Sequence, residues 1–148
     1  MNPNLFFTPT DILLPAHADM RRWSVIACDQ FTADAGYWQA VQDTVCDAPS
    51  TLRLMLPEFY LGKCDEAAAT REIQQAMRRY LDDGVFRTVP HSLVLVQRTL
   101  PGGTVRCGIV GALDLEAYDY APDSVTPIRA TEGTVASRLP ARVHIRAA

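Results

Sequence analysis

A Pro-Gly-Gly turn at residues 101–103, between two runs of alternating residues, is the feature that most restricts how this chain can fold. The run 92–98 alternates around Leu93 and Leu95, and the run 105–113 follows the turn. Alternation with a period of two is typical of a strand, and a glycine-rich turn between two such runs predicts an antiparallel hairpin. The chain is therefore expected to contain an antiparallel sheet.

Two helices are expected as well. The clearer one covers about 65–83, because Asp65 is a suitable N-cap, apolar residues form a stripe along one face, and Gly84 is well placed to end the helix. A second helix is expected over roughly 35–46, where aromatic and valine residues share a face.

Short strands are predicted at 23–27, 50–56 and 142–146, whereas prolines make residues 1–22 an irregular, partly extended arm. With 148 residues, of which 48% are hydrophobic, the chain can bury one core but not two. The predicted fold class is α+β: a single domain over 1–148, in which a mixed, largely antiparallel sheet packs against two or more helices.

Several functional classes are disfavoured. No apolar run approaches the ~20 residues of a membrane span, and no signal peptide is recognisable, so we expect a cytoplasmic protein. A net charge of −3 without a basic stretch between aromatic residues argues against nucleic-acid binding. The four cysteines lack the CxxC spacing of a zinc site and are expected to be reduced.

Charge reverses near the end of the chain. Residues 1–126 are acidic overall, whereas four arginines and one glutamate occupy residues 127–148. A guanidinium has a fixed fork of donors that suits carboxylate or phosphate, and a capped helix start also attracts anions. The candidate anion site comprises five substrate-binding residues and a catalytic base: Arg129, Thr131, Thr134, Arg138 and Arg142, with Glu132 as the base. The alternative is a set of solvated arginines paired with nearby acids.

Two further candidates involve acidic residues. Asp114 and Asp119 lie in an acidic segment after the hairpin and are candidate Mg²⁺ ligands. Asp29 follows a predicted strand and is a second candidate catalytic group. For each of these residues a role in a turn or cap is the alternative.

Several runs resemble the N-terminal part of the uncharacterised DUF1015 family, in order along the chain: 23–30, 37–38, 47–54, 108–116, 118–120, 128–134 and Arg138. Because members of this family are generally much longer, the resemblance implies that the 148 residues are a fragment or a shortened gene that corresponds to the N-terminal part of such a protein. It also suggests a role near phosphoserine, because such genes often accompany those of serine biosynthesis. Ala130 and Thr131 stand where many members have Pro and His, so chemistry that depends on that His is in doubt here.

The preferred functional hypothesis is a domain that binds a small phosphorylated or carboxylated metabolite, with phosphoryl transfer or hydrolysis as the reaction class and Mg²⁺ as a possible cofactor. The alternative is a non-catalytic interaction module that pairs through its C-terminal strand, either with a second copy in a homodimer or with a missing C-terminal domain. Whether the chain is an enzyme is left open.

Overall fold

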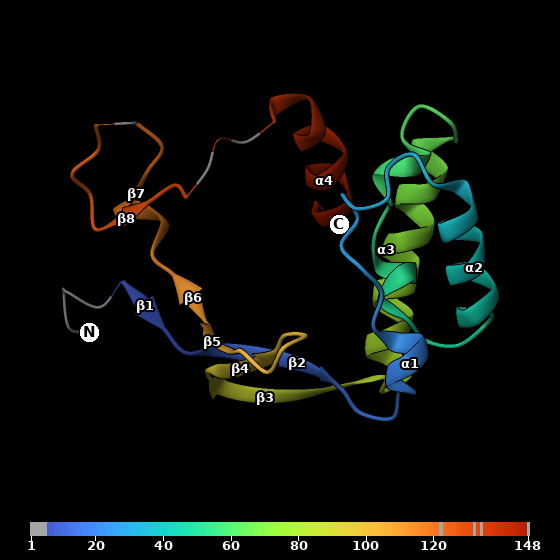
Figure 1. Cartoon of the computed structure of the whole chain (residues 1–148), viewed down its shortest axis with the longest axis horizontal. Coiled ribbons are helices and arrows are strands. Elements are labelled where there is room, and N and C mark those ends of the chain that lie inside the picture. The colour runs from blue at the N-terminus through green and yellow to red at the C-terminus, as the bar shows by residue number, and fades with distance from the viewer. Residues whose placement is uncertain (1–5, 122, 132, 134, 148) are drawn as a thin grey trace. The chain divides into compact units, whose positions relative to one another are not determined.

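The computed structural model describes residues 6–121, 123–131, 133 and 135–147. Its contacts divide the chain into two compact units (Figure 1). One unit comprises residues 1–14 and 88–134 and contains most of the strands, whereas the other comprises 15–87 and 135–148 and contains the helices. The predicted α+β class is confirmed.

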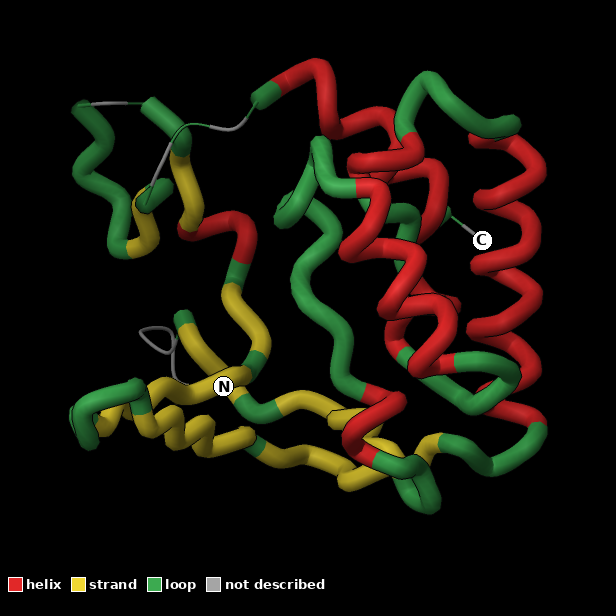
Figure 2. Tube along the Cα trace, turned by 45° about the vertical axis from the view of Figure 1, so that its right-hand side comes forward, coloured by secondary structure: helices red, strands yellow, loops and turns green. Residues whose placement is uncertain are grey.

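The helical unit consists of α-helices and short 3-10 turns that Figure 2 shows in red. Its α-helices are α1 (Met20–Trp23), α2 (Ala35–Val45), α3 (Glu66–Asp82) and α4 (Leu139–Arg146). Its 3-10 turns are η1 (Thr51–Leu54), η2 (Glu58–Tyr60) and η4 (Ala136–Arg138). Within the described residues, no helix has the length and apolar character needed to cross a bilayer.

The two long helices begin and end where the sequence predicts. The Asp34 carboxylate accepts a hydrogen bond from the Tyr37 amide at 2.9 Å and caps α2, and Asp65 caps α3 through the Ala68 amide at 3.0 Å. Gly84 follows α3 with a φ of +66°, a left-handed conformation that favours glycine. Both predicted helices are therefore confirmed, because their caps are encoded locally.

The core of the helical unit lies between α2 and the segment that contains η1. Trp38 and Val45 of α2 are 0% and 2% exposed, and Leu52 of η1 packs against them. On its other side η1 contacts α3, and α3 also contacts α4. Thus η1 separates two helices and is held from both sides.

The other unit is built from pairs of short strands. The predicted hairpin is confirmed: β4 (Val94–Thr99) and β5 (Val105–Val110) are antiparallel, with Leu95 opposite Ile109. The remaining strands form short pairs: β1 (Phe7–Thr8) with β6 (Ala112–Leu113), β2 (Thr10–Pro15) with β3 (Phe86–Ser92), and β7 (Tyr118–Asp119) in parallel with β8 (Ile128–Arg129). A 3-10 turn, η3 (Leu115–Ala117), precedes β7. The described strands thus form four two-stranded sheets.

Three predicted strands are wrong. Residues 24–27 form a loop after α1, and residues 51–54 form η1. Residues 142–146 belong to α4, where Ala141 and Ile145 lie four positions apart and share the inward face. Short apolar runs fit both the helical period of 3.6 residues and the strand period of two, and here tertiary packing decides between helix and strand.

Candidate functional site

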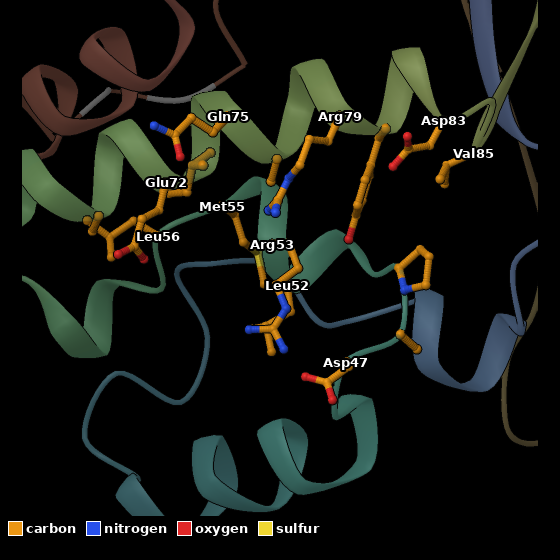
Figure 3. A pocket seen from close by; sticks show the side chains of 16 residues that line it. Asp47, Leu52, Arg53, Met55, Leu56, Glu72, Gln75, Arg79, Asp83 and Val85 are labelled. Atoms are coloured by element: carbon orange, nitrogen blue, oxygen red, sulfur yellow. The ribbon is translucent and has the colours of Figure 1, made fainter.

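The helical unit contains a groove of about 720 Å³ between α3 and the segment that leads into and out of η1 (Figure 3). Its lining comes from two stretches of sequence: Asp47, Ala48, Pro49, Leu52, Arg53, Met55 and Leu56 from the η1 side, and Ala69, Glu72, Ile73, Gln75, Ala76, Arg79, Tyr80, Asp83 and Val85 from α3 and the residues after it. This volume falls in the range of ~300–1,000 Å³ that is typical of small-molecule sites.

Buried hydrogen bonds hold the two walls of the groove together. Ser50 is 0% exposed, and its amide donates to the Tyr80 hydroxyl of α3 at 2.9 Å. The hydroxyl groups of Ser50 and Thr51 both donate to the carbonyl of Trp23, at 3.3 and 2.8 Å. Because buried polar groups are costly unless they are paired, the Ser50–Tyr80 bond fixes the start of η1 against α3, and the two bonds to Trp23 fix it against α1.

The floor of the groove is apolar. Ala76 and Ile73 of α3 are 3% and 6% exposed, and Leu52 of η1 is 8% exposed. Met55 and Leu56 continue this surface, and both are partly exposed. Leu52, Ile73 and Ala76 thus form an apolar floor.

Five charged side chains line the groove: Arg53, Arg79, Asp47, Glu72 and Asp83. None of these five forms an ion pair within 4.0 Å with another described residue. The Arg53 guanidinium donates to the carbonyl of Cys46, whereas the Arg79 side chain makes no hydrogen bond within the described part of the chain. In Figure 3 the Arg79 side chain extends from α3 toward η1. Arg79 is thus a cation available to a ligand.

A second cluster joins two of the residues that the sequence singled out. Arg142 of α4 donates to the Glu58 carboxylate at 2.8 Å and lies 3.7 Å from the Asp29 carboxylate. The Glu58 side chain is only 7% exposed, and its hydrogen bond with Arg142 raises the pKa of that guanidinium above the usual value. Arg142 already neutralises protein carboxylates here, so this cluster favours docking of α4 over binding of an external anion.

The remaining predicted anion-binding residues divide between the two units. Arg129 is exposed in β8, where it lies opposite Asp119 of β7, and Thr131 is exposed in a bend. The backbone of Arg138 lies in η4 of the helical unit. Glu132 and Thr134 lie outside the described residues. The shared anion site therefore stays a prediction.

The two candidate metal ligands make local contacts. The Asp114 carboxylate accepts from the Glu116 amide and caps η3, and the Asp119 carboxylate accepts from the Ala121 amide, both at 3.0 Å. In the part of the chain that the structure describes, three or more His, Cys, Asp or Glu side chains do not gather as a metal site. The four cysteines are free thiols. Binding of Mg²⁺ at these aspartates stays a prediction.

Sequence reasoning missed the groove, although one signal for it exists. Glu72, Ala76, Arg79 and Asp83 are spaced four, three and four residues apart, so they form one line along α3 and its C-cap. Charged residues on a line next to the apolar stripe mark the boundary between core and solvent. The sequence alone does not show that this boundary faces a groove.

A comparison of the sequence with models of protein families identifies one matching family. The family model with the description "Protein of unknown function (DUF1015)" matches residues 9–148. Searches of curated proteins and of solved structures found no significant match.

Proposed function

This chain belongs to the DUF1015 family, and we propose that its helical unit binds a small metabolite that carries a carboxylate or phosphate group. The binding site is the groove between α3 and η1. The anionic group of the metabolite would be held by Arg79, and its apolar part would lie on the floor formed by Leu52, Ile73 and Ala76.

The observation that carries this proposal is the Arg79 side chain, which lines a groove of ligand size without a protein partner among the described residues. A guanidinium can form two parallel hydrogen bonds with a carboxylate or a phosphate. The Arg53 side chain contributes further positive charge from the η1 side, although it also donates to a protein carbonyl. Small-molecule sites use placed polar groups to orient a ligand, and the groove has charged side chains above its apolar floor.

The contacts in the groove identify binding groups, so the proposal is limited to binding. Phosphoryl transfer or hydrolysis, with Mg²⁺ and with Glu132 and Asp29 as catalytic groups, stays a prediction from the sequence. The same holds for a link to serine metabolism.

The test is an affinity measurement on neighbouring arginines. Hexanoate and hexyl phosphate each combine an apolar chain with one anionic group, and titration calorimetry with the full chain measures how tightly they bind. Arg79→Gln is expected to weaken binding about tenfold, as for loss of a charge-assisted pair. Arg78→Gln is the matched control, because Arg78 is exposed on α3 and does not line the groove. Equal affinities of the two variants, or no binding to the wild type, would refute the proposal.

A second candidate function, an interaction module, is favoured by the β4–β5 hairpin. Leu95 and Ile109 lie opposite each other and are 70% and 60% exposed. Exposed apolar residues on a two-stranded sheet suit pairing with another protein surface. The C-terminal strand expected for this role is absent, since α4 occupies those residues, so the hairpin takes its place in the hypothesis.

Light scattering over a concentration series tests whether this surface joins two copies of the chain. A dimer that Leu95→Ser with Ile109→Ser converts to a monomer would support self-association through the hairpin. A wild-type chain that is monomeric throughout would exclude a homodimer.

A further inference from the structure

Resting on the proposed function, we infer that the groove recognises an α-amino acid head group, so its ligand carries an ammonium group beside the carboxylate. Asp83 would bind the ammonium group, Arg79 would bind the carboxylate, and an apolar side chain of the ligand would lie on the floor. The proposal thus narrows the ligand from any small anion to a zwitterion with an apolar side chain.

The charge balance of the lining is the first reason. The carboxylates of Asp47, Glu72 and Asp83 outnumber the guanidinium groups of Arg53 and Arg79. A ligand with negative groups alone would meet this excess of negative charge, and a repulsive contact costs affinity. A ligand that also carries a positive charge compensates the carboxylate nearest to its anionic end.

The spacing of Arg79 and Asp83 is the second reason. Arg79 lies in the last turn of α3 and Asp83, four positions later, is the C-cap of that helix, so their Cβ atoms lie roughly one helical turn, about 5–6 Å, from each other. Both side chains line the groove, and they do not form an ion pair with each other within 4.0 Å. A guanidinium and a carboxylate that are one helical turn apart and not paired with each other can bind the carboxylate and the ammonium group of one α-amino acid.

The position of the apolar floor is the third reason. Ala76 lies one turn before Arg79 on α3, and Ile73 lies a further turn back. From Glu72 to Asp83 the lining of α3 extends roughly 16 Å, at 1.5 Å per residue. With its head group at the Asp83 end, a ligand therefore has room to place an unbranched apolar side chain along the floor.

Three matched probes separate the contributions of the two charges. L-Norleucine has both groups, hexanoate lacks the ammonium group, and pentylamine lacks the carboxylate. We expect the full chain to bind norleucine about tenfold more tightly than either of the other two, as judged by titration calorimetry. In Asp83→Asn the affinity for norleucine should fall to that for hexanoate, whereas the affinity for hexanoate should not decrease.

Asp82→Asn is the matched control, because Asp82 is exposed next to Asp83 and does not line the groove. It should bind norleucine as the wild type does. If hexanoate binds as tightly as norleucine, or if the Asp83 and Asp82 variants behave alike, this inference is overturned while the proposed function stands. If neither the three probes nor hexyl phosphate binds, both this inference and the proposed function are refuted.

Discussion

Replacement of Tyr80 by Phe should destabilise the helical unit by removing one oxygen atom. That hydroxyl accepts from the Ser50 amide at 2.9 Å, and Ser50 is completely buried. In Tyr80→Phe the buried N–H loses its partner, and an unsatisfied buried donor costs about 1–3 kcal/mol. The aromatic ring, which lies 6.1 Å from Trp23, keeps its packing.

Denaturant unfolding followed by tryptophan fluorescence measures this cost, since both tryptophans belong to the helical unit. The unfolding midpoint should fall, and the slope against denaturant should not change. Tyr37→Phe is the control, because the Tyr37 hydroxyl makes no hydrogen bond with the described residues, and its effect should stay within about 0.5 kcal/mol. A loss in Tyr80→Phe no larger than that in Tyr37→Phe would show that the hydroxyl does not hold the groove walls together.

Three further changes have expected outcomes. Arg142→Ala removes a charged partner from the buried Glu58 carboxylate and should cost about 1–2 kcal/mol in chemical unfolding, reduced by the partial exposure of Arg142. The pKa of Arg142 is raised in the folded chain, so the stability that Arg142 contributes is fully present below its unfolded-state pKa and is lost only as the pH rises above it. The free-energy cost of Arg142→Ala should therefore persist up to about pH 10. A cost that disappears by that pH would contradict this reasoning. Gly111→Ala should lower the thermal midpoint of unfolding, because the added carbon atom would lie 2.8 Å from a backbone oxygen, and an unchanged midpoint would refute the close packing. Burial, then the nearby Glu66 and Asp65 charges, raise the pKa of Cys64, so Glu66→Gln should speed its alkylation at pH 8, and an unchanged rate would leave no role for that charge.

Local signals in the sequence predict the elements that local contacts determine. Asp34 and Asp65 cap their helices through amides three residues away, and the Pro-Gly-Gly turn closes a hairpin of adjacent strands. Each of these features needs only a few neighbouring residues. The two helices and the hairpin were therefore predictable.

The groove depends instead on contacts between distant parts of the chain. Leu52, Leu54 and Leu56 alternate like a strand, yet residues 51–54 form η1, whose N-cap Ser50 bonds to Tyr80, thirty residues away. Arg142 similarly meets Glu58 across 84 positions of the sequence. Such pairings cannot be read from periodicity, so the sequence identified Arg142 and Asp29 as polar candidates but not the partner that binds Arg142.

A nitrogen-15 NMR titration of the full chain with L-norleucine shows directly whether a small carboxylate binds in the groove between α3 and η1. The amide signals of Leu52, Met55, Ala76 and Asp83 should shift during the titration. In Arg79→Gln the same shifts should need about tenfold more norleucine, whereas Arg78→Gln should titrate as the wild type does. Shifts confined to the β4–β5 hairpin, or identical titrations of the two arginine variants, would contradict binding in the groove.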